Sequence, residues 1–144
     1  MPFIGFNFDK IEALKNVDEI KGNVNVKNAL NILDVKLQEV TVDKKQEVLK
    51  FIFEFKLDYE PKIGSISLTG NMMYLDDQKK LKEIIQGWKK DKKLPPDIMK
   101  GLFNTVLIKA NIKALNLAQD INLPPHLPLP KLQQQSKDYS EYIG

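Results

Sequence analysis

The chain contains no cysteine, no arginine and only one histidine. Without cysteine, disulfide bonds, thiolate metal sites and thiol chemistry are excluded. The one histidine, His126, cannot form a His-rich metal site, and no signal for an acid partner or oxyanion hole accompanies it. No Gly-rich phosphate loop and no HExxH spacing occurs either. We therefore expect a protein that binds without a cofactor rather than an enzyme, with His126 in a packing or surface role.

All 22 basic residues are lysine, and the formal net charge is +3. Arginine is the usual residue for bidentate reading of guanine, so its absence argues against sequence-specific nucleic-acid recognition. Lysine still attracts phosphate irrespective of sequence. No apolar run approaches a membrane span and no signal peptide opens the chain, so we expect a cytoplasmic protein.

The length of 144 residues, with 42% apolar and 28% charged residues, suits one globular domain. We place this domain at residues 1–132. Residues 133–144 are polar, and we expect them to form a disordered tail.

Alternating apolar residues predict a series of strands between residues 4 and 75. The strongest runs from Val48 to Tyr59, where apolar residues occupy every second position. A connection around Pro61 and Gly64 joins it to a second alternating run, which predicts an antiparallel hairpin. Weaker alternation covers residues 4–8, 24–26 and 33–37. The sheet therefore has four strands, or five if residues 22–28 form a strand of their own.

The apolar period changes at Asp76-Asp77, where two acids favour the start of a helix. Residues 78–91 carry a single apolar stripe within a shell of lysines, which predicts a surface helix. A second helix, residues 97–121, follows Pro95-Pro96. These patterns give an α+β fold in which two helices pack on one face of an antiparallel sheet.

The second helix is apolar on two sides. Its core-facing stripe comprises Phe103, Leu107, Ala110, Ala114, Leu117, Ala118 and Ile121. A second stripe, at Ile108, Ile112 and Leu115, lies roughly 100° or more away around the helix. A helix with two apolar sides contacts two bodies. Either both belong to one subunit, such as the sheet and the C-terminal segment, or the second stripe is an oligomer interface.

The segment after Ile121 contains four prolines, which forbid a helix and favour extended chain. The leucines between them, including Leu127 and Leu129, are too apolar for a free linker. We expect this Pro/Leu arm, residues 122–132, to pack against the domain or against a partner subunit.

The lysines of residues 79–93 most simply form a solvated helix face. The alternative is an RNA- or ribosome-associated protein in which Lys89, Lys90, Lys92 and Lys93 contact the phosphate backbone. In that case Trp88 is the only aromatic side chain available there for base stacking.

The order of elements resembles that of the SecB family of export chaperones. The resemblance lies in Ile4–Ile11 as an opening strand, Val48–Tyr59 with Gly64–Gly70 as a central hairpin, and the long helix followed by Leu123–Pro130. It covers roughly residues 3–132 as a pattern. Uncharacterised archaeal proteins with a similar Pro/Leu ending also resemble this chain.

The resemblance implies a homo-oligomer, a dimer or dimer of dimers, that binds non-native polypeptides in apolar grooves without ATP. Members of the family are acidic and meet an export motor, whereas this chain has net charge +3, so we do not extend the motor contact to it. For the groove we predict a lining of Phe51, Phe53, Met72, Tyr74, Leu127 and Leu129.

Overall fold

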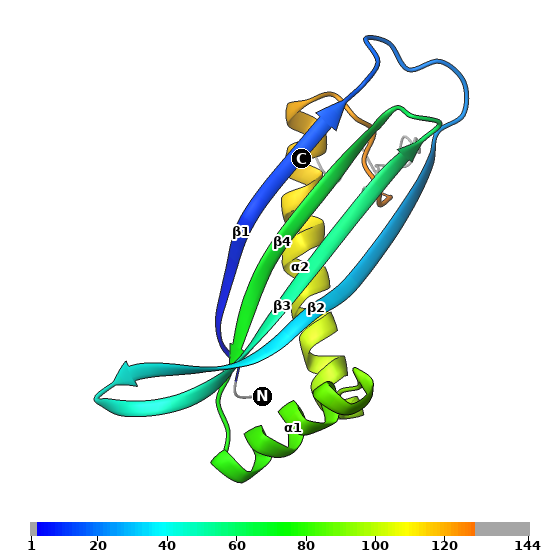
Figure 1. Ribbon diagram of the computed structural model, residues 1–144. Coiled ribbons are helices and arrows are strands. Elements are labelled where there is room, and N and C mark those ends of the chain that lie inside the picture. Colours follow the sequence, from blue (N-terminus) through cyan, green and yellow to red (C-terminus); the bar gives the residue numbers. More distant parts are fainter. Residues whose placement is uncertain (1–2, 129–144) are drawn as a thin grey trace, which may run out of the picture.

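A single antiparallel sheet forms the centre of the protein (Figure 1). The computed structural model describes residues 3–128. The four strands lie in the order β1-β4-β3-β2. Their bounds are β1 Phe3–Lys15, β2 Asn25–Val42, β3 Lys44–Glu60 and β4 Gly64–Tyr74. The predicted antiparallel sheet is confirmed with four strands.

No separate strand forms at residues 22–28. Instead β2 is 18 residues long and joins the two weakly alternating segments that the sequence presents. The junction is a register irregularity between Ile32 and Asp34, opposite Phe53 and Ile52 of β3. The extra residue, Leu33, changes the apolar positions of β2 from even to odd, and Ile32 and Val35 therefore both lie opposite core residues of β3.

Period-two alternation in β3 and β4 builds the core. Phe51 pairs with Met72, and Phe53 with Gly70, so these residues share one face of the sheet. The Phe53 ring lies so close over Gly70 that a β-carbon there would sit 2.7 Å from its Cζ atom. Phe6 of β1 stacks on the same ring, with centroids 5.3 Å apart. A β-carbon at Gly70 would come still closer to the Asn7 carbonyl oxygen of β1, so strand pairing and aromatic packing together require glycine here.

One part of the sheet has only two strands. β3 pairs with β4 only from Leu49 toward its C-terminal end. Its pairing with β2 extends farther in the other direction, to the pair of Lys44 with Val42. Residues 39–47 thus form a two-stranded ribbon that extends beyond the other strands (Figure 1). At its tip Asp43 adopts φ 71°, as the short turn requires.

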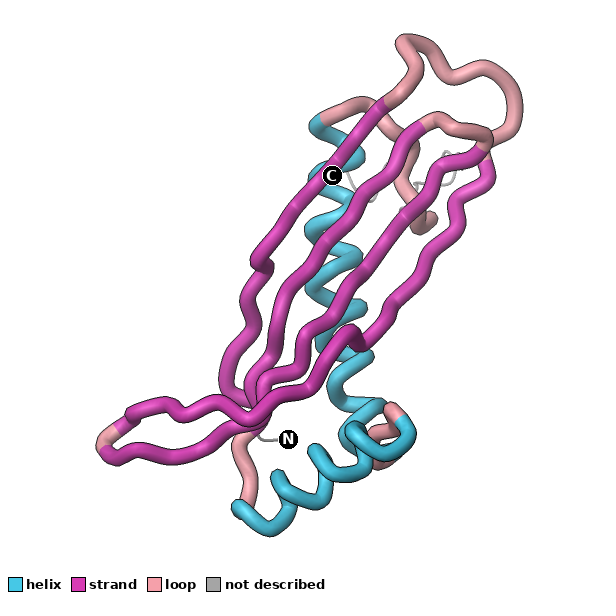
Figure 2. Tube along the Cα trace, in the orientation of Figure 1, coloured by secondary structure: helices cyan, strands magenta, loops and turns pink. Residues whose placement is uncertain are grey.

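Two helices follow the sheet, as predicted: α1 Gln78–Asp91 and α2 Pro96–Asp120. Both lie on the same side of the sheet, α2 along it and α1 near the end where the ribbon begins (Figure 2). Asp77 precedes α1 but makes no side-chain capping bond. Asp76 instead accepts a hydrogen bond of 2.6 Å from the Tyr74 hydroxyl, which lowers the pKa of the Asp76 carboxyl. Asp76 thus anchors the end of β4, and neither acid caps the helix through its side chain.

The face of α2 that meets the sheet differs in part from the predicted stripe. Its buried residues are Ile98, Leu102, Val106, Ala110, Ala114 and Ala118. Phe103, Leu107, Leu117 and Ile121 are only partly buried and flank this line. The three buried alanines are small, so the C-terminal half of α2 can lie close to the sheet. The line of α2 residues that contacts the sheet is therefore shifted by one position from the stripe predicted from the larger side chains.

The Pro/Leu arm leaves α2 and turns back along the domain. Leu123 is buried, and its backbone N–H donates to the Ala118 carbonyl at 2.8 Å. Leu129 and the tail residues 133–144 lie outside the described residues. Neither helix of the described chain is long and apolar enough to span a bilayer.

Candidate functional site

Four of the residues predicted to line a groove lie in the protein core. Phe51 and Phe53 are 0% exposed, Met72 is 1% and Tyr74 is 4% exposed. They share one face of the sheet, as their alternation indicates, but the helices cover that face, and rings of β1 pack beside Phe51 and Phe53. In this protomer they support the fold and offer no surface to another chain. Of the remaining two, Leu127 is 36% exposed on the arm.

An apolar groove does exist beside this core, between β2 and the helices. It measures about 460 Å³. Its lining comprises Leu30, Asn31, Ile32 and Leu33 of β2, Trp88 of α1, Lys92 after α1, and Met99 and Phe103 of α2. Six of these eight side chains are apolar, which is the usual composition of a site for apolar ligands.

The irregularity in β2 gives the groove its exposed wall. Leu30 and Ile32 face the helices, opposite Phe55 and Phe53 of β3. Leu33 is the extra residue and remains 49% exposed. A large apolar side chain therefore stands at the rim of the groove rather than in the core.

Trp88 is the aromatic residue by which α1 lines the groove. It is 6% exposed, and the Lys92 ammonium lies 5.2 Å from the centre of its ring. Its indole Nε1 is buried and finds no hydrogen-bond acceptor within residues 3–128. A buried donor without a partner is uncommon in folded proteins, so this N–H is a candidate for a bond to a bound group.

β2 is also an edge strand of the sheet. Its inner edge pairs with β3, and no strand of the described chain pairs with its outer edge. The exposed Leu33 and the 39% exposed Leu37 lie on this strand. An unpaired edge next to an apolar groove presents backbone donors and acceptors together with apolar surface.

The arm lies against the domain next to this groove. The Tyr59 hydroxyl donates to the Pro124 carbonyl at 2.8 Å, and burial raises the pKa of this hydroxyl. His126 Nε2 lies 2.8 Å from Asn111 Oδ1, and its ring packs edge-on against Phe55 at 6.3 Å between centroids. The arm thus bridges α2 and β3, and the predicted packing of the Pro/Leu segment holds for its described part.

This packing disfavours the charged form of His126. Because Asn111 Oδ1 accepts, Nε2 carries the proton, and Nδ1 is buried without a partner among the described residues. Protonation would create a buried charge and a second N–H, so burial lowers the pKa of His126.

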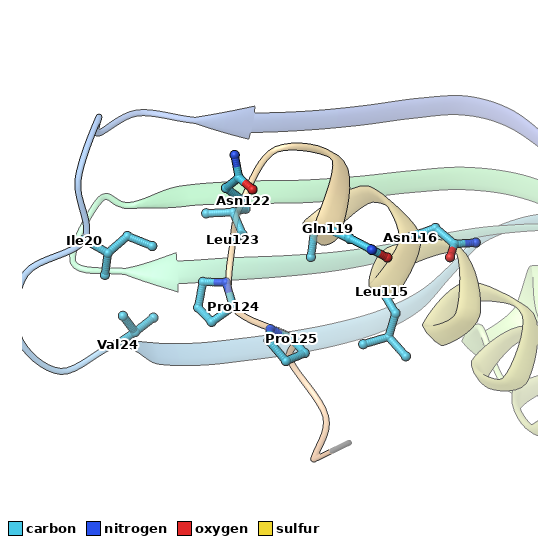
Figure 3. A pocket seen from close by; sticks show the side chains of 10 residues that line it. Ile20, Val24, Leu115, Asn116, Gln119, Asn122, Leu123, Pro124 and Pro125 are labelled. Atoms are coloured by element: carbon cyan, nitrogen blue, oxygen red, sulfur yellow. The ribbon is translucent and has the colours of Figure 1, made fainter. Parts of the chain in front are cut away.

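A second cavity, of about 810 Å³, lies between the start of the arm and the loop before β2 (Figure 3). Pro124 and Pro125 border it on one side, with Ile20 and Val24 on another. Leu115 lines the same cavity and is partly buried. The second apolar stripe of α2 therefore contacts the arm region of its own subunit at this residue.

The other two residues of that stripe have no cover in the protomer. Ile108 is 64% exposed and Ile112 is 58% exposed. Because they lie four residues apart on a straight helix, they form one apolar strip about 6 Å long. Of the two interpretations of the stripe, contact within one subunit therefore applies to Leu115 and not to the two isoleucines.

The lysines of the RNA hypothesis, Lys89, Lys90, Lys92 and Lys93, are exposed at the end of α1 and just after it. Trp88, the aromatic residue that this hypothesis uses for stacking, is buried beneath Lys92. No base can lie flat on it without displacing that lysine. The RNA contact remains a prediction.

Sequence reasoning missed most of the groove residues. The signal that could have identified them is a change of parity in β2: Leu30 and Ile32 fall on even positions, whereas Val35 and Leu37 fall on odd ones. Such a change predicts a bulge. It does not show that α1 and α2 leave a gap beside the bulge.

Neither models of known protein families nor curated proteins match this sequence. Among solved structures, the chain is similar to the SecB-like chaperone Rv1957 of Mycobacterium tuberculosis, in complex with a ChAD peptide from the Rv1956 HigA1 antitoxin. The TM-score is 0.54 at 10% sequence identity, and the match covers 92% of this chain and 91% of the other. At this identity the comparison establishes a SecB-like fold.

Proposed function

We propose that this protein is a SecB-like molecular chaperone that binds extended, apolar segments of non-native polypeptides without ATP. The observation that carries the proposal is the apolar groove beside the unpaired edge of β2. The likeness in fold to a chaperone that was solved with a peptide supports the same function.

The groove supplies apolar contact for alternate side chains of an extended client. Each aliphatic or aromatic side chain that it fully buries contributes about 1.5–3 kcal/mol. Two such side chains give about 3–6 kcal/mol before the costs of association, so one groove binds no tighter than tens of micromolar. Binding of this strength is reversible, as a chaperone requires.

The edge of β2 supplies backbone contact. A client that lies along this edge adds a strand to the sheet, and such pairing is independent of the client sequence. The unpartnered indole N–H of Trp88 offers one further hydrogen bond to a client carbonyl. Apolar pockets and backbone pairing together select unfolded chains, because folded proteins expose neither extended backbone nor rows of apolar side chains.

We further propose that the strip of Ile108 and Ile112 packs against the same strip of a second copy. An exposed apolar helix strip is self-complementary about a two-fold axis, which is the commonest symmetry of soluble oligomers. A dimer would also place two grooves in one particle. Two weak grooves on one particle hold a long client more tightly than either alone.

The test measures binding of reduced, carboxymethylated α-lactalbumin, a permanently unfolded chain, by fluorescence anisotropy with and without ATP. We expect saturable binding that ATP leaves unchanged. The variant Leu33→Asp should weaken it at least about tenfold, because a carboxylate at the rim must lose water when a client binds. Leu33 is already half exposed, so the fold should tolerate the change.

Leu14→Asp is the matched control, since Leu14 is 56% exposed on β1, at the opposite edge of the sheet. It introduces the same charge and should leave binding unchanged. No binding by the parent protein, or equal losses in both variants, would refute the proposed groove. Binding to a single-stranded RNA that falls steeply with salt, without binding to the unfolded chain, would favour the RNA alternative instead.

A further inference from the structure

We infer that the groove beside β2 selects apolar segments that carry a carboxylate, and that Lys92 recognises this carboxylate. The carboxylate is either the side chain of an acidic residue close to the apolar ones or the free C-terminus of the client. This specificity rests on the function proposed above, because it names the class of polypeptide that the groove binds.

The first observation is the charge of the groove lining. Among the described residues that line the groove, the polar ones are Asn31 and Lys92, and only Lys92 is charged. Its ammonium lies 5.2 Å from the centre of the Trp88 ring, so the charge stands beside the apolar surface that a client covers. The ion pairs within residues 3–128 all join other lysines to carboxylates. The cation at the groove is therefore available to a ligand.

The backbone fixes the position of this lysine. Lys92 terminates α1 with φ 58°, and its N–H donates to the Trp88 carbonyl at 2.9 Å. The next residue is held as well, since the Lys93 N–H donates to Asp91 Oδ1 at 3.2 Å. The Lys92 side chain thus starts from a defined helix end, and the carboxylate of Asp91 is engaged by its own backbone.

The acids close to the groove in sequence do not offset this charge. Asp34 lies opposite Ile52, which alternates with the core residues of β3, and therefore belongs to the face of the sheet away from the helices. Its carboxylate accepts the Val35 N–H at 2.9 Å. Asp97 is exposed in the first turn of α2, where it complements the positive end of that helix. Around Lys92, in contrast, three further lysines are exposed: Lys89, Lys90 and Lys93.

Trp88 supplies a second group of the same kind. Its indole Nε1–H is buried and has no acceptor in the part of the chain that the structure describes. An indole N–H and an ammonium can only donate hydrogen bonds, so both require an acceptor from a ligand. A carboxylate offers two acceptor oxygens together with a negative charge. A lysine or arginine at the same place in a client would instead meet the Lys92 ammonium as a like charge.

The spacing of an extended client agrees with this arrangement. Side chains on one side of a strand are two residues apart, or about 6.6 Å. A client side chain that packs against the Trp88 ring therefore brings the side chain two positions along within reach of Lys92 Nζ, which lies 5.2 Å from the ring centre. The selected segments have an apolar residue followed, two positions later, by an acidic residue or by the end of the chain.

The experiment compares synthetic peptides that share an alternating leucine and serine core without tryptophan or tyrosine. Three amidated peptides carry glutamate, glutamine or lysine two positions after the last leucine, and a fourth carries glutamine followed by a free C-terminus. Trp88 is the single tryptophan and lines the groove, so its fluorescence reports binding directly. We expect the glutamate peptide to bind about two- to fivefold more tightly than the glutamine peptide, and the lysine peptide more weakly by a similar factor.

The fourth peptide distinguishes the two sources of the carboxylate. Tighter binding than that of the amidated glutamine peptide assigns the site to a client C-terminus, and a gain confined to the glutamate peptide assigns it to an acidic side chain. The variant Lys92→Gln should abolish these differences while it still binds the amidated glutamine peptide. Lys79→Gln is the matched control, since it removes the same charge from an exposed position at the start of α1 and should preserve the differences.

Equal affinity of the parent protein for all four peptides would overturn the inference and leave the proposed groove intact. Equal losses of selectivity in both variants would trace it to net charge and would overturn the role of Lys92. No binding of any peptide would refute the groove and its specificity together. Single-stranded RNA that displaces the glutamate peptide, without any binding of the amidated glutamine peptide, would assign Lys92 to phosphate and would also overturn the inference.

Discussion

The exposed strip on α2 leads to a prediction about assembly. Replacing Ile108 and Ile112 together by glutamine should convert the dimer proposed above into a monomer. Glutamine is a good helix former and similar in length, so α2 itself should be preserved. The two side chains are exposed in the protomer, and their loss removes no core contact.

The magnitude follows from the exposed fractions. Ile108 is 64% and Ile112 is 58% exposed, so about six-tenths of each side chain remains to be buried at an interface. At about 1.5–3 kcal/mol for complete burial, each contributes about 1–2 kcal/mol. A two-fold axis brings four isoleucines together, which gives about 4–7 kcal/mol. The variant should thus raise the dissociation constant of the dimer by at least about a thousandfold.

Sedimentation velocity from 1 to 50 µM protein, roughly the range in which such a difference in affinity is visible, gives the mass directly. The control is Ile11→Gln/Leu14→Gln, which makes the same replacement at two residues of β1 that are 45% and 56% exposed. It should leave the mass unchanged. A parent protein that is monomeric throughout, or a double variant of α2 with the parental mass, would refute the reasoning.

Three further predictions concern stability and pH. Gly70→Ala should lower the free energy of unfolding by about 1–3 kcal/mol in urea denaturation, because its β-carbon would overlap the Asn7 carbonyl oxygen of β1 and the Phe53 ring. Tyr59→Phe should cost about 1 kcal/mol in the same assay, since the Pro124 carbonyl loses its donor. The contribution of His126 should be complete above pH 6.5 and decline as the pH falls below that value. The pKa of its imidazole is lowered by folding, so the unfolded chain takes up the proton first. A His126→Gln variant whose stability falls with pH as steeply as the parent's over pH 7 to 5 would contradict this last prediction.

Much of the fold follows from local periodicity. The alternation around Phe53 is strong because β3 lies in the centre of the sheet and is covered on one face, so every second residue must be apolar. The single stripe of α1 gives both the limits and the orientation of that helix. Both signals are complete within one segment of sequence, which is why they can be read without knowledge of the rest of the chain.

The candidate site depends on how segments far apart in the sequence meet, and local patterns do not contain that information. The alternation places Phe51 and Phe53 on one face but does not tell whether a helix covers it. The groove lies between β2 and the two helices, so it depends on the position of α2 relative to the sheet. The helical stripe records which residues are apolar and does not give that position.

The two-stranded ribbon at residues 39–47 has a consequence for local motion. Its amide hydrogen bonds join two strands with no third strand beside them, and the ion pair that braces it, Lys45 with Glu39 at 3.8 Å, is exposed to solvent. An isolated hairpin is only marginally stable in water. The amide protons of its β3 part, residues 44–47, should exchange with deuterium long before those of Phe53 or Leu57, although all belong to one continuous strand. The hydrogen bonds of the ribbon can therefore open without unfolding of the four-stranded sheet. β3 combines a labile N-terminal part in the ribbon with a rigid part in the sheet.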